Sequence, residues 1–301
     1  MNKTAKALAL MMALLLTLAG CGAIKTQTYS FAMGPKGSDF YALGEGICTD
    51  LTAGVSGVRF NPVESGGSVS NVDMLFDGSA QLAMMTADVA VQALAAHPKL
   101  RAVAPLFSQA LHVVATGTSG IRSLFDLKAR RVSLGTKGTG VAALAERIIA
   151  AAHLELRDIQ RQYLEPAEAF EQMKSGKLDA CFVLAAPGSS AIAQLAQEMD
   201  VVIVPLTDEA MRRLTENSDT FTEGEIPAHS YKNQDERVDA VFVDALVVTT
   251  SDLPDNVAIS MAAVFREKAA ETLKKVGIAA VTEGTVSNIP LHEGLESKKN
   301  E

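Results

Sequence analysis

The sequence predicts an α/β protein of two lobes with a ligand cleft between them. Short apolar runs typical of strands alternate with helix-length patterns from about residue 29 to residue 277. Two similar glycine-rich turns, GPKGS at 34–38 and GTKGTG at 135–140, each join a strand-like run to a helix-like run. No low-complexity linker interrupts the alternation. Such a pattern is typical of largely parallel sheets covered by helices on both faces.

The strand candidates are runs rich in Val, Ile, Leu and Phe. They lie at 29–33, 58–63, 81–85, 101–107, 111–116, 131–134, 180–184, 201–205 and 238–249.

The segments between these runs have the length and periodicity of helices. They lie at 40–52, 69–76, 89–96, 141–152, 165–174, 189–198, 209–217 and 256–276. Start and stop signals support several of them. Pro187 and Gly188 precede the helix that begins at Ser189, and Ser175 and Gly176 follow the helix that begins at 165.

Two long apolar runs, 111–116 and 238–249, are natural segments for the chain to cross between lobes. We therefore expect lobe one to combine 28–115 with 240–290, and lobe two to comprise 116–239. Residues 291–301 are expected to form a flexible tail.

The first residues have the pattern of an export signal. Lys3 and Lys6 give a basic start, residues 7–18 form an apolar run too short to span a bilayer, and 18–21 read LAGC. This resembles the bacterial lipoprotein pattern, in which Cys21 is acylated and becomes the new N-terminus. We expect residues 1–20 to be removed, 21–27 to be a tether, and the mature protein to be anchored by lipid to the cell envelope, in the periplasm or on the outer face of the cytoplasmic membrane.

Composition excludes several classes of partner. The chain has 27 basic and 35 acidic residues and a formal charge of −8. Loss of the signal removes two lysines and no acid, which leaves 25 basic residues, 35 acidic residues and a charge of −10. This balance argues against nucleic acid and against electrostatic attachment to anionic lipid. Cys48 and Cys181 fall in different predicted lobes, so we expect free, buried thiols and no disulfide.

Glycine-rich turns before helices suit anion binding. The first N–H groups of a helix have no intrahelical partner, and the helix dipole places about half a positive charge there. Glycine lets several such groups approach one carboxylate. Three turns have this character, at 34–38, 65–68 and 135–140, and we expect all three to face one cleft.

A nucleotide site fits the sequence poorly. The P-loop has lysine directly after its last glycine, whereas Lys137 precedes Gly138. The dinucleotide fingerprint GxGxxG is missing as well, so we expect no cofactor.

A set of short motifs occurs in a defined order along the chain. They are GSDFYALG at 37–44, SGGSVSN at 65–71, Gly78, TAD at 86–88, HVV at 112–114, GIRSLFDLK at 120–128, RVSLG at 131–135, GTG at 138–140, EAF at 168–170, GKLDA at 176–180, Pro187, Ile226, Pro227 and Tyr231. From about residue 29 to 275 this order resembles the TAXI family of solute-binding subunits of tripartite ATP-independent periplasmic (TRAP) transporters.

The resemblance implies a two-lobed, type II-like periplasmic-binding-protein fold that closes on a small carboxylate. The ligand would be an amino acid such as glutamate or a C4–C5 dicarboxylate, delivered by a monomeric receptor to a membrane permease subunit. Ligand contacts are expected at Lys36, Gly37, Ser38, Tyr41, Ser65, Gly67, Ser68, Asn71, Thr86, Lys137, Gly138, Thr139, Gly140, Pro187 and Tyr231. Departures from the family pattern at 39–41 and 139–141 lie in these loops and leave the ligand's identity open.

Several of these residues have an alternative role. Lys36 and Lys137 would contact a dianion or stay solvated, as loop lysines mostly do. Tyr41 and Tyr231 would contact ligand or pack with a wet tip. Asp39 would bind a ligand ammonium or cap its helix, and both roles stay open.

Capping is the better interpretation of Asp88, which precedes a helix. His112 lies in an apolar run and is expected to be a satisfied core or hinge histidine. The five histidines lack metal-ligand spacing and no GxSxG elbow occurs, so we expect no enzyme. The leading hypothesis is a TRAP solute receptor. The alternatives are a receptor for an ABC importer or a sensor kinase, and an exported enzyme that uses the cleft.

Overall fold

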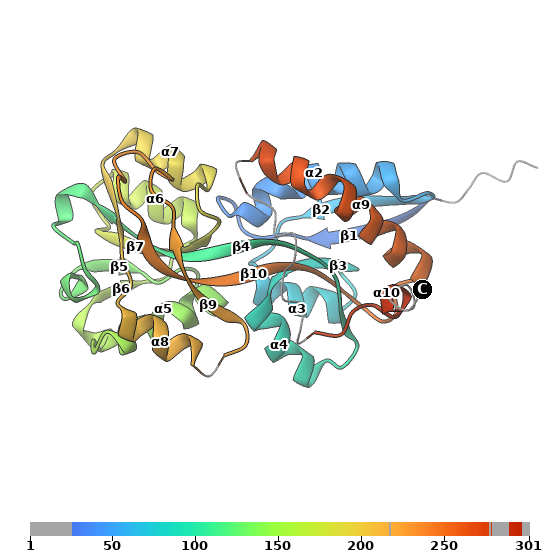
Figure 1. Cartoon of the computed structure of the whole chain (residues 1–301), viewed down its shortest axis with the longest axis horizontal. Helices are drawn as coiled ribbons and strands as arrows, with labels where there is room; N and C mark the ends of the chain where they lie inside the picture. The colour runs from blue at the N-terminus through green and yellow to red at the C-terminus, as the bar shows by residue number, and fades with distance from the viewer. Residues whose placement is uncertain (1–25, 217, 277, 279–288, 297–301) are drawn as a thin grey trace, which may run out of the picture.

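The computed structural model describes residues 26–216, 218–276, 278 and 289–296, and shows two lobes joined by two long strands (Figure 1). These strands, β4 (Leu100–Thr116) and β10 (Val238–Thr250), pair antiparallel from Thr250↔Leu100 to Phe242↔Ala110. The predicted two-lobed α/β fold is confirmed. The residue boundaries of the lobes and the tail stay predictions.

The first lobe contains the N-terminal strands and helices and the last two described helices (Figure 1). Its strands are β1 (Gln27–Ala32), β2 (Val58–Val63) and β3 (Leu82–Thr86), and its helices are α2 (Asp39–Gly54), α3 (Ser68–Phe76), α4 (Ala87–Ala96), α9 (Asp255–Lys275) and α10 (Glu293–Glu296). Strand β1 is parallel to β2 and β3, and β10 is antiparallel to β3. Helices α2 and α9 pack on one face of this sheet, and α3 and α4 cover the other.

The second lobe contains the middle of the chain. Its strands are β5 (Arg131–Ser133), β6 (Gln160–Gln162), β7 (Ala180–Ala185), β8 (Val201–Val204) and β9 (Phe221–Ile226), and its helices are α5 (Gly140–Ala151), α6 (Pro166–Lys174), α7 (Ser190–Glu198), α8 (Asp208–Thr215) and the short 3₁₀ turns η1 (Gly117–Ser119), η2 (Leu124–Leu127) and η3 (Leu156–Asp158). Strand β5 is parallel to β6 and β7.

The sheet is mixed and not largely parallel. Strands β7 and β8 are antiparallel to β4, and β9 is antiparallel to β10. Strand β4 runs into this lobe from the first one, and β10 runs back to the first lobe. The runs 101–107 and 111–116 form the single strand β4, although Ser108 and Gln109 interrupt the apolar pattern. Strands β6 and β9 were not predicted, because QRQ and FTEGEI lack an apolar run.

The two described cysteines are free, buried thiols, as predicted. Cys48 lies on α2 in the first lobe, and Cys181 lies on β7 in the second. Burial raises the pKa of each thiol to about 12. Both are therefore protonated at neutral pH and behave as small core residues. Cys21 lies outside the described residues, and no helix within the described ranges is long and apolar enough to cross a membrane.

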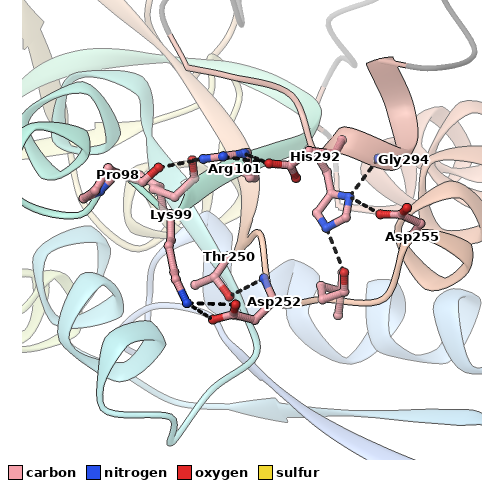
Figure 2. Close-up of polar contacts among 11 residues, drawn as sticks. Pro98, Lys99, Arg101, Thr250, Asp252, Asp255, His292 and Gly294 are labelled. Carbon is pink, nitrogen blue, oxygen red and sulfur yellow. Dashed lines mark hydrogen bonds and ion pairs between the residues drawn. The ribbon is translucent and has the colours of Figure 1, made fainter.

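Residues 289–296 pack against the start of β4 (Figure 2). The Ala102 N–H donates to the Pro290 carbonyl at 2.9 Å, and the His292 N–H donates to the Ala102 carbonyl at 3.0 Å. The fully buried His292 ring donates from Nε2 to the Leu253 carbonyl at 2.9 Å. Arg101 and Glu293 add an ion pair at 2.7 Å. This segment therefore closes the end of the first lobe far from the second one (Figure 1).

Candidate ligand-binding site

A cavity of ≈ 80 Å³ lies between the lobes, where the three glycine-rich turns meet. Both lobes contribute to it. Its lining residues are Pro35, Ser38, Phe40, Gly66, Gly67, Ser68, Thr86, Gln109, Gly135, Thr136, Thr139, Gly140, Val141, Pro166, Phe182, Val183 and Leu184. The expectation that the three turns face one site therefore agrees with this geometry.

The first turn ends at Ser38, the N-cap of α2. The Ser38 hydroxyl donates to the Pro35 carbonyl at 2.7 Å and accepts from the Tyr41 N–H at 3.2 Å. Next to it, Gly37 has a φ of +82°, and a Cβ there would lie 3.2 Å from the Ala167 backbone nitrogen of α6. Glycine at 37 therefore allows this turn to contact the opposite lobe.

The second turn leads into α3 through Gly67, which has a φ of +94° and no side chain to cap the helix. The Ser68 hydroxyl accepts from the Thr86 N–H at 3.1 Å and from the Thr86 hydroxyl at 3.3 Å. Ser68 also lines the cavity, where its hydroxyl can contact a ligand. Ser65 supports the turn by accepting from the Gly67 N–H at 3.2 Å.

The third turn leads into α5 through its N-cap Thr139. The Thr139 hydroxyl donates to the Thr136 carbonyl at 2.7 Å and accepts from the Ala142 N–H at 3.4 Å. A Cβ at Gly140 would lie 3.1 Å from Cγ2 of Val89 on α4. The lobes thus contact each other on this side of the cavity as well.

Four helices begin at the cavity. Their N-cap residues Ser38, Gly67, Thr86 and Thr139 all line it. The N–H groups of a helix's first turn have no intrahelical partner, and the helix dipole makes this end electropositive. The arrangement therefore suits an anion held by backbone N–H groups and hydroxyls.

Neither predicted lysine lines the cavity. Lys36 is exposed, with its Nζ 3.7 Å from Oε2 of Glu64. Lys137 and Gly138 are exposed and line a separate groove that also contains Asp88 and Arg147. A ligand contact by either lysine stays a prediction, and the geometry favours the solvated alternative.

Three other predicted residues lie outside the cavity lining. Asn71 is fully buried and donates from Nδ2 to the Met33 and Met84 carbonyls at 2.7 and 2.6 Å, which ties β1 to β3. Tyr41 is exposed on α2, and Pro187 is half-buried in the loop after β7. None of them lines the cavity in this conformation.

Asp39 joins the two lobes. It is the first residue of α2 and is 3% exposed. Its carboxylate accepts from the Ala186 N–H at 2.6 Å and from the Ser189 hydroxyl at 2.6 Å, both in the loop between β7 and α7. Burial raises the pKa of Asp39, and these two hydrogen bonds oppose the shift. Asp39 is thus engaged by the second lobe, a role different from both the cap and the ammonium ligand considered above.

Tyr231 and His112 form a buried pair beside this loop. The His112 Nδ1 donates to the Ala110 carbonyl at 2.9 Å, so its Nε2, 2.8 Å from the Tyr231 hydroxyl, is left to accept. The Gly188 N–H donates to the same hydroxyl at 3.2 Å. Burial lowers the pKa of the fully buried His112 to about 4, so the ring is neutral at physiological pH. His112 is therefore a satisfied core histidine, as expected.

Several lining residues were not predicted. Gln109 is 4% exposed, and its Nε2 is 3.4 Å from the Leu184 carbonyl. The only signal for it is a glutamine within an otherwise apolar strand. Phe40, Val141 and residues 182–184 read as ordinary core positions, and nothing in their sequence pattern marks them as lining. Within the described ranges, no group of three or more His, Cys, Asp or Glu residues could hold a metal ion.

The chain matches a known protein family and is similar in fold to several solved structures. A model described as the NMT1-like family matches residues 31–297. The alkanesulfonate-binding protein SsuA from Xanthomonas axonopodis pv. citri, bound to MOPS, is 14% identical, with a TM-score of 0.50 over 88% of this chain and 80% of that one. The GluR0 ligand-binding core in complex with L-glutamate is 12% identical, with a TM-score of 0.53 over 85% of this chain and 99% of that one.

A putative L-cystine ABC transporter protein from Listeria monocytogenes is 11% identical, with a TM-score of 0.52 over 83% of this chain and 95% of that one. At these identities the similarity shows the two-lobed fold alone. None of the three descriptions names an enzyme. The fold implied by the resemblance to periplasmic solute-binding proteins is confirmed, whereas these comparisons do not extend to the narrower TAXI assignment.

Proposed function

We propose that this chain, which belongs to the NMT1-like family, is the solute-binding component of a membrane importer. The observation that carries this proposal is the interlobe cavity at which four helices begin. Contacts at Gly37, Gly140 and Asp39 enclose it from both lobes. A small anionic solute would be captured as the lobes close and released as they open.

The energetics of such a site are reasonable. Micromolar binding corresponds to about −8 kcal/mol. Each hydrogen bond to a charged group contributes roughly 1.5–3 kcal/mol, and immobilising the partners costs at least ~4 kcal/mol. Roughly five to eight contacts are therefore needed. The first turns of α3 and α5, with the hydroxyls of Ser68 and Thr136 and the amide of Gln109, offer that many donors around one cavity.

The membrane partner is proposed to be an ABC importer. This partner is favoured by the description of the similar Listeria monocytogenes structure, which names an ABC transporter. The ordered motif set favours a TRAP permease as the second candidate. Uptake of the bound solute in cells separates the two. An ABC importer stops when ATP is depleted with the ion gradient intact, whereas a TRAP importer stops when the ion gradient is collapsed.

The protein is proposed to act outside the cytoplasmic membrane, held by a lipid on Cys21. The motif LAGC at 18–21 motivates this proposal. Cys21→Ala should release the mature protein from the membrane fraction, and incorporation of labelled fatty acid should be lost with it. An unchanged membrane fraction in the variant would contradict the anchor.

Binding itself is tested by titration calorimetry of the purified, ligand-stripped protein with a panel of small carboxylates and sulfonates. At least one saturable, one-to-one interaction is expected. Folded protein that binds no member of the panel would contradict the proposed function.

A further inference from the structure

The lining of the cavity combines polar and apolar groups. The polar groups are the N-terminal ends of α2, α3, α4 and α5 and the buried amide of Gln109. The apolar side chains of the lining are Pro35, Phe40, Val141, Pro166, Phe182, Val183 and Leu184. A ligand that matches both kinds of group has an anionic head and an uncharged, apolar body.

None of the described residues that line the cavity is Lys, Arg, His, Asp or Glu. An anionic head needs no charged partner there, because helix N-terminal N–H groups and hydroxyls supply the donors. An ammonium group has the opposite requirement. It carries three donors and would face electropositive helix ends with no carboxylate to receive it, and burying an unpaired charge is strongly unfavourable.

Neither of the two nearby carboxylates, Asp39 and Asp88, is part of the cavity lining. Both oxygens of Asp39 already accept hydrogen bonds, at 2.6 Å each, from the loop after β7. Asp88 has one oxygen, Oδ1, without a hydrogen-bond partner among the described residues, and it lines the neighbouring groove that contains Arg147 and Lys137. Its Oδ2 would lie 3.8 Å from a Cβ at Gly140, and Thr139 and Gly140 border both the groove and the cavity.

The volume of the cavity limits the ligand's size. The cavity, at ≈ 80 Å³, has room for a ligand of a few heavy atoms. This is the size of a carboxylate or sulfonate with two or three further heavy atoms.

We infer that the solute is a short organic monoanion, a carboxylate or a sulfonate, that has no ammonium group. The inference rests on the proposed function and refines it, because it separates simple anions from amino acids of the same length. The anionic head lies at the N-terminal ends of α3 and α5 near Ser68 and Thr136, and the body packs on Phe182 and Leu184.

Matched ligand pairs test the inference by titration calorimetry of the purified protein. Propionate is compared with L-alanine, and ethanesulfonate with taurine, because each pair differs by an ammonium group. The simple anion of at least one pair should bind, and its ammonium-bearing partner should bind at least about tenfold more weakly. The pair that binds more tightly shows whether the head is a carboxylate or a sulfonate.

Equal or tighter binding of L-alanine or taurine would overturn the inference and leave the proposed function standing. The inference would also be overturned, with the proposed function still standing, if the protein binds glutarate or L-glutamate but neither propionate nor ethanesulfonate. If no compound of either kind binds to folded protein, the proposed function itself fails.

One variant tests the same inference from the protein's side. Gln109→Glu places a negative charge in the lining with little change of shape. The variant should bind the simple anion at least about tenfold more weakly than wild type does. The ratio of affinities between the simple anion and its ammonium-bearing partner should also become smaller. Gln194→Glu, on the exposed face of α7 beside Glu198, is the matched control and should leave both affinities unchanged. Thermal unfolding verifies that each variant is folded, and an unaltered preference in folded Gln109→Glu protein would contradict the inference.

Discussion

Replacement of Asp39 by alanine should weaken solute binding while the protein stays folded. The carboxylate accepts two hydrogen bonds across the lobes, from the Ala186 N–H and the Ser189 hydroxyl. If the lobes separate when the cavity opens, these bonds are made only in the closed form. Their loss therefore lowers the stability of the closed, ligand-bound form relative to the open form.

The magnitude follows from the two contacts. Hydrogen bonds to a charged group contribute roughly 1.5–3 kcal/mol each, which gives about 3–6 kcal/mol before desolvation is counted. The Asp39 side chain is 3% exposed in the closed form, and the free-energy cost of removing its carboxylate from water offsets part of this gain. A net loss of about 2 kcal/mol is a reasonable expectation. It corresponds to a roughly thirtyfold increase in Kd.

The assay is titration calorimetry with the tightest anion of the panel, run on wild type, Asp39→Ala, Ser189→Ala and the double variant. Ser189→Ala removes one of the two bonds and should have the smaller effect. The double-mutant cycle should give a coupling of about 1 kcal/mol, since the two side chains are in contact. Asp73→Ala, at an exposed position of α3, is the control. A Kd for Asp39→Ala within twofold of wild type, with no coupling in the cycle, would refute the reasoning.

Three further predictions concern closure, charge and pH. Gly140→Leu places a side chain where a Cβ alone would lie 3.1 Å from Cγ2 of Val89, so it should hold the lobes apart and weaken binding at least about tenfold, as calorimetry would show; unchanged affinity would contradict the close approach. The resemblance implies a ligand contact at Lys137, but the lysine is exposed and lies outside the cavity lining. Lys137→Ala should therefore have a Kd within twofold of wild type, and a larger change would restore the lysine as a ligand contact. Burial lowers the pKa of His112 from its ordinary 6.5 to about 4 in the folded protein. Between these two pH values the unfolded chain binds a proton at His112 that the folded protein does not bind. Acidification from pH 6.5 to 4 should therefore lower the free energy of unfolding by about 3 kcal/mol. Denaturant unfolding of wild type and His112→Gln checks this, and an equal acid loss in both proteins would exclude His112 as its source.

The helices and the glycine turns were predictable because their signals are local. Apolar periodicity predicted the first and last residues of α2 to within two positions, and those of α3 to within one. The turns at 65–68 and 135–140 combine glycine with a following helix, and both reach the cavity.

The rest of the site depends on contacts between distant parts of the chain. Gln109 and Leu184 meet only because β4 pairs with β7, which no local pattern specifies. The partners of Asp39 lie 147 and 150 residues away, which is why its role could not be assigned from the sequence. Lys137 shows a further limit, since a position inside a binding turn does not determine where a long side chain points.

The most direct test of the account is a crystal structure of the protein purified together with its own solute. Electron density for a small anion should fill the cavity between the lobes, with its charged head at the N-terminal ends of α3 and α5 and no lysine in contact. Density for a solute held by Lys137 or Arg147 in the neighbouring groove, with the interlobe cavity free of solute, would contradict the account.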